Sequence, residues 1–281
     1  MKKIIVIAAI FSFFLPASQA LATTEKKTNP AGNSHPSFCR ADSLHVKIRV
    51  GYNLGGTSPI PLPASIRSID AFRPTASPSV GADIQFPIPL PGSKRDTACN
   101  PSGANPRFSI SAGLRLENKG MDIDATVKSY RMEMTKGNSQ ISGLFSGHIS
   151  QQVTQWMLTV PINFQFSISN FQFSFGPFFS LLFSKNFSGI ASSGYLRQGD
   201  PTGPKIDIGD KEGEWATYDF SPSMRSLQWG LSLSLDWNAT PRLGLFASLS
   251  WGLSGIFNSD FTTVQQSLYP IYGSLGLFYN L

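Results

Sequence analysis

Charged residues are scarce in this chain, and its most apolar segment has none. Lys, Arg, Asp and Glu make up 14 % of the 281 residues, whereas soluble globular domains carry roughly 25 %. The segment from Trp156 to Phe183 contains none of them. A soluble barrel turns one face to water and normally places charges on it. The absence of charge therefore argues against a barrel with a water-exposed face.

A long uninterrupted apolar run is also missing from this segment. The residues that interrupt it are Pro161, Asn163, Gln165 and Asn170. A membrane-spanning helix needs about 20 consecutive, mainly apolar residues. A helical membrane anchor is therefore excluded here.

The segment does contain a regular alternation of apolar and polar residues. Apolar side chains occupy every second position from Trp156 to Ile168, which is the period of a β-strand. A two-residue turn at Ser169 and Asn170 predicts a tight hairpin. Its expected cross-strand pairs are Ile168 with Phe171, Phe166 with Phe173 and Phe164 with Phe175. One face of the hairpin is aromatic and the other is small and neutral, so we expect the aromatic face to contact lipid.

The same alternation recurs along the chain and predicts about eight strands. Their expected ranges are 45–53, 80–86, 108–116, 156–168, 171–183, 227–237, 243–253 and 271–281. An even number of strands is typical of single-chain bacterial outer-membrane barrels. We therefore predict an all-β fold, an eight-stranded antiparallel transmembrane β-barrel of outer-membrane type with long external loops. The expected loops are 54–76, 118–151, 186–222 and 258–267, although Met121 to Met134 can also continue the third strand as a hairpin arm.

The alternation also predicts which side chains face the lumen and which face lipid. The charged residues expected in the lumen are Lys47, Arg49, Asp83, Arg115, Glu117 and Asp236. The aromatic residues expected against lipid are Trp156, Phe164, Phe166, Phe173, Phe175, Trp229, Trp237, Trp251 and Tyr279. Side chains alone about fill an eight-stranded lumen, so no diffusion pore is expected. Pro161 and Pro177 lie within strands, where we expect local bulges.

The N-terminal region predicts export from the cytoplasm. Residues 1–22 have the pattern of a cleavable signal peptide, with two lysines, an apolar core and an Ala-Leu-Ala site. Residues 23–43 form an expected flexible periplasmic tail, and residues 44–281 form the expected outer-membrane domain. Removal of Lys2 and Lys3 lowers the formal net charge from +6 to +4. This small excess is spread over loops and tail, so no nucleic-acid partner is expected.

Cysteine is limited to Cys39 and Cys99. The predicted topology places both on the periplasmic side, in an oxidising compartment. We predict a disulfide bond between them, and the alternative is two free thiols.

Several segments resemble the PorT-like family of bacterial outer-membrane β-barrel proteins, over roughly residues 45–281. They are GYNLGGTSPIPLP at 51–63, IRSI at 66–69, GLRLENKGM at 113–121, LTVPI at 158–162, FGPFFSLL at 175–182, SLQWGLSLSLDW at 226–237 and YPIYGSLGLFY at 269–279. The resemblance implies an eight-stranded barrel in the cell outer membrane, without a catalytic motif. It also implies a possible part in protein secretion and surface export. The implied partners are outer-membrane lipid, the barrel-insertion machinery and secretion or envelope proteins.

Two other classes of function stay open at this stage. Small outer-membrane barrels can be hydrolases or acyltransferases, and His148 lies near Ser146 and Ser150 in the sequence. A soluble secreted lipid-binding barrel is the second alternative. We predict a non-enzymatic protein that acts through its loops, with no catalytic, cofactor-binding or metal-ligating residues.

Overall fold

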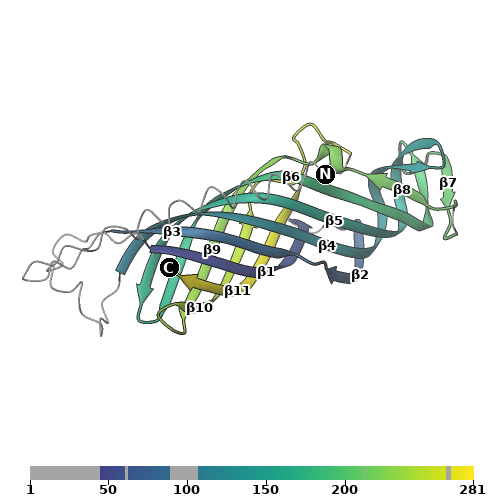
Figure 1. Ribbon diagram of the computed structural model, residues 1–281. Coiled ribbons are helices and arrows are strands. Elements are labelled where there is room, and N and C mark those ends of the chain that lie inside the picture. Colours follow the sequence, from purple (N-terminus) through teal and green to yellow (C-terminus); the bar gives the residue numbers. More distant parts are fainter. Residues whose placement is uncertain (1–44, 61–62, 89–106, 212, 264–266) are drawn as a thin grey trace, which may run out of the picture. The chain divides into compact units, whose positions relative to one another are not determined.

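The computed structural model describes residues 45–60, 63–88, 107–211, 213–263 and 267–281 (Figure 1). These residues form one antiparallel β-sheet of eleven strands. The strands are β1 His45–Pro59, β2 Ile66–Pro74, β3 Pro78–Pro87, β4 Arg107–Lys136, β5 Ser139–Ile168, β6 Phe171–Gln198, β7 Lys205–Ile208, β8 Ala216–Asp219, β9 Leu227–Asn238, β10 Leu243–Gly252 and β11 Leu268–Asn280. A short 3-10 helix, η2, covers Ser221–Ser223. None of the helical structure in the described ranges could span a membrane.

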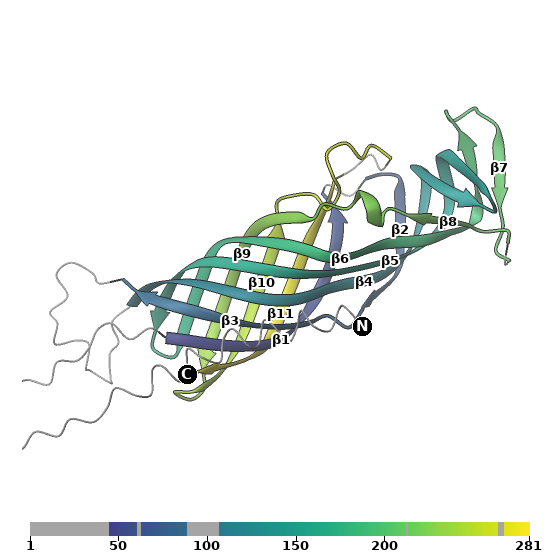
Figure 2. The ribbon, with the colours of Figure 1, turned by 45° about the horizontal axis from the view of Figure 1, so that its top comes forward.

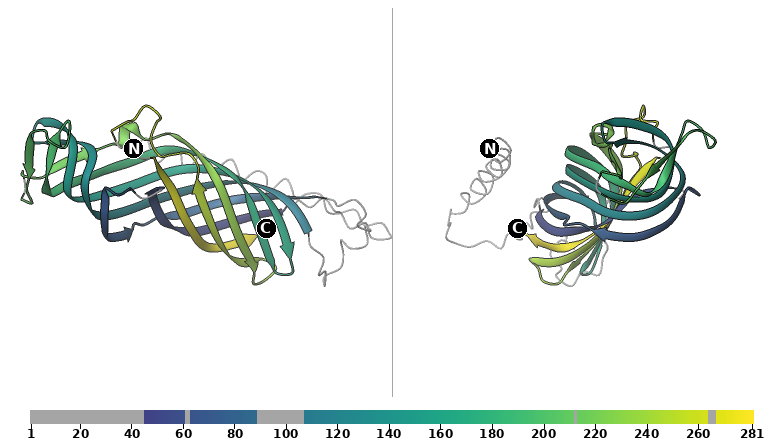
Figure 3. Two further views of the ribbon diagram at one scale, coloured as in Figure 1. Left: turned by 180° about the vertical axis from the view of Figure 1, so that it is seen from behind. Right: turned by 90° about the vertical axis from the view of Figure 1, so that its right-hand side faces the viewer.

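Eight of the strands close into a ring. Neighbours pair in the order β1-β3-β4-β5-β6-β9-β10-β11, and β11 pairs with β1. Seen from behind, the green and yellow strands β9 to β11 complete the side that β4 to β6 leave open (Figure 3). The sheet is therefore closed on itself along the part that these eight strands share.

The hairpin between β5 and β6 has the register that the sequence predicts. Ile168 pairs with Phe171, Phe166 with Phe173 and Phe164 with Phe175. Ser169 begins the turn at φ 52°, a left-handed conformation that suits tight hairpin turns. The prediction for this part of the sheet is confirmed.

The bulges expected at Pro161 and Pro177 are absent, so that prediction is wrong. Pro161 pairs with Phe178 and Pro177 with Leu231, and the register is the same on both sides of each proline. The shift in this region lies between Trp156 and Met157 instead. A proline lacks one N–H group, and the β5–β6 ladder lacks the pairs of Ile162 and Asn163 after Pro161 without inserting a residue.

The predicted loop 118–151 is wrong, because both strands of the hairpin run through it. β4 and β5 stay paired up to Lys136 and Ser139, and only Gly137 and Asn138 form the turn. The alternative that Met121 to Met134 continues the third strand is confirmed. Ser, Gly, Thr and Gln dilute the apolar alternation in this segment, so its sequence looks like a loop.

The predicted loops 54–76 and 186–222 also contain strands. β1 continues to Pro59. β2 pairs with β4 from Met121 to Val127, beyond the part of β4 that pairs with β3. β6 continues to Gln198, where β7 and β8 pair with it. The extended parts of β4, β5 and β6, together with β2, β7, β8 and η2, project beyond the ring (Figure 2). We call this projecting part the distal unit.

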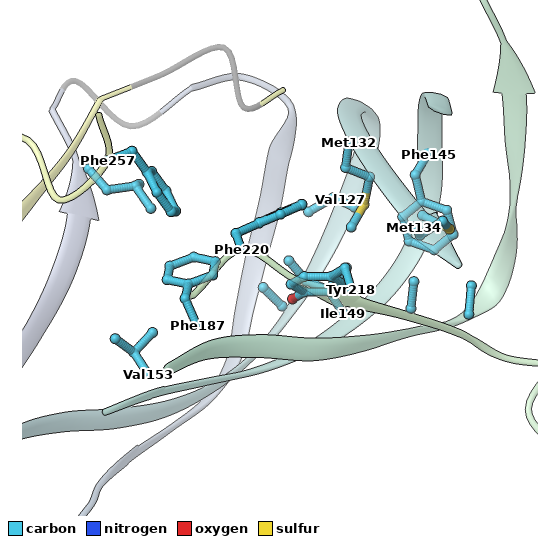
Figure 4. Packing of buried hydrophobic residues seen from close by; sticks show 14 of the residues in the cluster. Val127, Met132, Met134, Phe145, Ile149, Val153, Phe187, Tyr218, Phe220 and Phe257 are labelled. Atoms are coloured by element: carbon cyan, nitrogen blue, oxygen red, sulfur yellow. The ribbon is translucent and has the colours of Figure 1, made fainter. Parts of the chain in front are cut away.

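The distal unit has its own apolar core, which we call the distal core. Its buried members are Met121, Ala125, Val127, Met132, Met134, Ile141, Phe145, Ile149, Val153, Phe187, Ala191, Leu196, Ile208, Ala216, Tyr218, Phe220, Met224, Ile256, Phe257 and Leu268. Phe187, Phe220 and Phe257 gather where the ring opens into the distal unit (Figure 4). β8 pairs with β6 and also with β4, at Thr135 and Thr217. This pairing holds the curled end of the β4–β5 hairpin against the rest of the unit.

Candidate functional site

A network of charged side chains fills the interior of the ring. Asp236 on β9 is completely buried and accepts hydrogen bonds from two cations on β1. Lys47 Nζ lies 2.7 Å from its Oδ2. Arg49 donates to both carboxylate oxygens, at 2.9 Å and 2.6 Å. This two-pronged contact has the geometry of a strong charge-assisted pair.

The network continues to β3 and β4 through Asp83. Its carboxylate binds Arg49 Nε at 2.5 Å and Arg115 Nη2 at 3.2 Å. Nearby, Glu117 lies 3.5 Å from Lys119 Nζ and accepts a hydrogen bond of 2.8 Å from Thr159. The Lys119 ammonium also lies 5.4 Å from the ring centre of Phe178, within the range of a cation–π contact.

All six charged residues expected in the lumen lie in this network. Lys47, Arg49, Asp83, Glu117 and Asp236 are at most 5 % exposed, and the Arg115 side chain is 12 % exposed. With Lys119 there are four cations and three anions, a net charge of +1. The sequence analysis missed Lys119 because it placed that residue in a loop. Its position two residues after Glu117 was the available signal, because alternate residues of a strand share a face.

Neutral amide side chains join the charged groups. Gln172 accepts a hydrogen bond of 2.7 Å from Lys47 and donates one of 2.8 Å to Gln165. The space between Arg49, Arg115 and Glu117 has no room for a water molecule. The interior of the ring is therefore packed with hydrogen-bonded polar side chains and leaves no open channel at this level.

The aromatic residues expected against lipid lie on the opposite face of the strands. Seven of them are 37–55 % exposed: Phe164, Phe173, Phe175, Trp229, Trp237, Trp251 and Tyr279. Trp156 and Phe166 are half-buried. Most of the polar residues that alternate with them, such as Asn163, Gln165 and Ser174, are buried. The ring thus has an apolar outer surface and a polar interior, the reverse of a soluble barrel.

The distal unit carries a polar cluster around Asp70 on β2. Ser68 and Thr126 donate hydrogen bonds of 2.7 Å to its carboxylate, and His148 Nδ1 lies 3.4 Å away. The hydrogen bonds from Ser68 and then Thr126, together with the charge of His148, lower the pKa of Asp70 below its ordinary value. This cluster links β2, β4 and β5 across the surface of the distal unit.

The serines near His148 bond to other groups. Ser146 Oγ accepts a hydrogen bond of 2.9 Å from the Ser129 amide. Ser150 donates to Asp124, and this bond and the Arg73 guanidinium lower the pKa of Asp124. The structure therefore does not assemble the His-Ser pair that an acyl-transfer mechanism would need. Within the described ranges, no three His, Cys, Asp or Glu residues gather into a possible metal site.

The predicted disulfide between Cys39 and Cys99 lies outside the described residues, and so do the predicted signal peptide and tail. These three features stay predictions.

Burial of Tyr130 in the distal unit leads to a pH prediction. Burial raises the pKa of Tyr130 to about 12 from an ordinary value of 10.0. Below about pH 10 the phenol is neutral in both the folded and the unfolded state, and its contribution to stability is fully present. This contribution is lost as the pH rises through about 12, because the unfolded state ionises more readily than the folded state. We expect Tyr130→Phe to reduce the alkaline loss of stability. Urea unfolding midpoints at about pH 9 and about pH 11.5 would check this; an unchanged difference between the two midpoints would contradict it.

Comparison with known proteins agrees with this architecture. Residues 32–258 match the family model described as outer membrane protein beta-barrel domain. No curated protein matches the sequence.

Two solved structures share a low overall likeness with the chain. One is Ail, the attachment invasion locus protein of Yersinia pestis, in complex with the heparin analogue sucrose octasulfate; it has 10 % identity, a TM-score of 0.29 and coverage of 85 % of this chain and 99 % of that one. The other is the translocator domain of the autotransporter NalP from Neisseria meningitidis, with 12 % identity, a TM-score of 0.20 and coverage of 99 % and 97 %. At these values neither likeness bears on function. The family match covers most of the sequence, and the chain belongs to the outer membrane protein beta-barrel domain family, whose members lie in the cell outer membrane.

Proposed function

We propose that this protein is a non-enzymatic, non-conducting outer-membrane barrel that presents the distal unit on the cell surface for binding. The observation that carries the proposal is the contrast between two interiors. Paired charges and amides fill the ring around Asp236, whereas the distal unit is built around an apolar core. The first interior blocks transport, and the second stabilises a folded module beyond the ring.

The dimensions of the outer surface support lipid as the partner of the ring. Trp229 and Trp237 lie near the two ends of β9, and the strand between them is about 27 Å long at about 3.4 Å per residue. A tilt of about 40° reduces this to roughly 21 Å, near the apolar band of about 25 Å in outer-membrane barrels. Aromatic residues at both edges are typical of the membrane interfaces. We place Trp156 and Trp251 at the same edge as Trp229.

The lengths of the connections support an orientation. The turns at 169–170 and 239–242 are tight, and β11 ends on the same side of the ring (Figure 1). Outer-membrane barrels have short turns on the periplasmic side and longer segments outside. The distal unit then lies outside the cell, where it is free to meet a ligand or partner.

Two measurements test this proposal. Proteoliposomes with the purified full-length protein should not swell in small neutral sugars, while a porin in matched liposomes should admit them. Protease added to intact cells should cut within 118–151 or 186–222 and should leave the ring intact. Sugar-dependent swelling equal to that of the porin, or complete resistance in intact cells with cleavage in inverted vesicles, would overturn the proposal.

Protein export is a second candidate process. It rests on the segments that resemble the PorT-like family, such as residues 51–63 and 226–237. In this case the distal unit or the periplasmic turns would contact secretion or envelope proteins. A deletion strain that loses a defined set of surface proteins, restored by the full-length chain, would support export. An unchanged set of surface proteins in the deletion strain would contradict a role in export.

A further inference from the structure

The distal unit has an open hollow of about 590 Å³ on the face opposite the distal core. Its lining includes Arg73, Asp122, Thr135, Gln152, Thr217 and Asp219. The neighbours of these residues along the strands, such as Met121, Met134 and Ala216, are buried in the distal core, and Tyr218 of that core also reaches the lining. Successive side chains of a strand point to opposite faces. The hollow therefore lies mainly on the outer side of β4, β5, β6 and β8, and Gln151 and Tyr218 extend its wall toward the distal core.

Several polar groups in the hollow lack partners inside the protein. Asp122, Thr135, Gln152 and Thr217 have no side-chain hydrogen bond to any other described residue, and Asp122 Oδ1 is shielded from solvent without a partner. Thr135, Gln152 and Thr217 are exposed to solvent, whereas a buried polar atom such as Asp122 Oδ1 is usually hydrogen-bonded in folded proteins. Carboxylate, hydroxyl and amide groups here offer both donors and acceptors. The wall is thus equipped to form several hydrogen bonds with a ligand.

The charges and the apolar content of the wall narrow the ligand class. Arg73 is paired with Asp124 at 2.7 Å, while Asp122 and Asp219 add two negative charges to the lining. A phosphate or sulfate group would meet these carboxylates and be repelled. Ile190 is the one large aliphatic side chain of the lining, which gives little support for an acyl chain. A neutral ligand rich in hydroxyl groups fits the carboxylate, hydroxyl and amide groups of this wall.

We propose that this hollow binds a neutral saccharide. Vicinal hydroxyls donate to a carboxylate such as Asp122 and accept from the hydroxyl and amide groups of Thr217 and Gln152. The volume falls within the range of about 300–1,000 Å³ that is common for small-molecule sites. The proposal rests on the proposed function only in placing the hollow outside the cell.

A free oligosaccharide and the sugar headgroup of a glycolipid share this chemistry. The hollow lies on the same face of β5 as Trp156, since Gln152 and Trp156 are four residues apart on the strand. That face continues into the apolar outer surface of the ring. A headgroup in the adjoining leaflet and a free sugar can therefore both reach the hollow.

The test uses the full-length protein in detergent on an array of neutral and acidic oligosaccharides. We expect neutral sugars to bind and Asp122→Asn to weaken binding at least about tenfold, because a charge-assisted hydrogen bond is lost. Asp260→Asn is the matched control; it makes the same charge change at an exposed site away from the hollow and should bind like the wild type. Thr217→Val provides a second variant that removes one hydroxyl, in case Asp122→Asn folds poorly.

A second arm separates the two sources of the sugar. It measures binding to phosphatidylcholine vesicles with and without a neutral monoglycosyl diacylglycerol. Binding to the array supports a free saccharide, and binding only to the glycolipid vesicles supports a headgroup. No binding in either arm, preference for acidic sugars, or binding by both Asp122→Asn and Thr217→Val equal to that of the wild type overturns the proposal. None of these outcomes changes the swelling measurement, so failure here is distinct from failure of the proposed function.

Discussion

Asp236→Asn is expected to destabilise the folded ring by about 3–5 kcal/mol, the usual cost of removing one partner of a buried ion pair. The side chain is fully buried and binds both Lys47 and Arg49. Without its charge, Lys47 loses its nearest carboxylate in a site that excludes water. Urea unfolding in detergent micelles, followed by tryptophan fluorescence, would measure the change.

Two further variants separate loss of the ion pair from general damage. Asp260→Asn makes the same chemical change on the surface, where substitutions usually alter stability by less than about 0.5 kcal/mol. The double variant Lys47→Met, Asp236→Leu removes one charge of each sign, which keeps the net charge of the network at +1 and leaves Arg49 paired with Asp83. It should be closer to the wild type than Asp236→Asn, because uncharged replacements of buried ion pairs are often tolerated. An Asp236→Asn protein that unfolds at the wild-type urea concentration would contradict the expectation.

The strands of the ring could be predicted because lipid outside and packed polar groups inside impose a strict alternation. Trp229 to Trp237 on β9 shows this pattern without interruption. Which charged residues pair with each other inside the ring could not be predicted from this alternation. Lys47 and Asp236 are 189 residues apart in the sequence, and their meeting across the lumen depends on the stagger of the closed sheet. Alternation gives the face of a residue but not its partner.

The distal unit was harder to predict because its strands change face. Val127 is buried, and after the irregularity between Val127 and Tyr130 the buried residues are Met132 and Met134. Ser129 has a φ of 54° at this point. An irregularity that adds a residue moves the following side chains to the other face. The period-two pattern is therefore broken in the sequence even though the strand continues in the structure.

Contacts between distant segments complete the distal core, and this also hides it from sequence analysis. Tyr218 and Phe220 come from a polar segment that resembles a loop, and Phe257 follows β10. Neither segment shows a long apolar alternation of its own. They form a core only because β8 pairs with β6 and thereby brings Phe220 next to Phe187.

Phe187→Ala is expected to unfold the distal unit while the ring stays folded. Phe187 is 2 % exposed, and its ring centre lies 4.9 Å from that of Phe257 and 6.0 Å from that of Phe220. Loss of a buried phenylalanine costs about 3–5 kcal/mol. This cost falls on the distal core, because the interior of the ring is held by separate polar contacts. Limited proteolysis should therefore cut β4–β6 beyond the ring much faster than in the wild type.

Phe183→Ala is the matched control, because Phe183 lies on the same strand and is 62 % exposed. It should leave the rate of cleavage in the distal unit near the wild-type value. The folded ring can be followed in the same samples by its resistance to unfolding in detergent on an unheated gel. If Phe187→Ala abolishes this resistance together with the protection of the distal unit, the two parts unfold as one cooperative body. If both are retained, Phe187 is not needed for the distal core. Selective loss of protection is the outcome that follows from two separate interiors within one sheet.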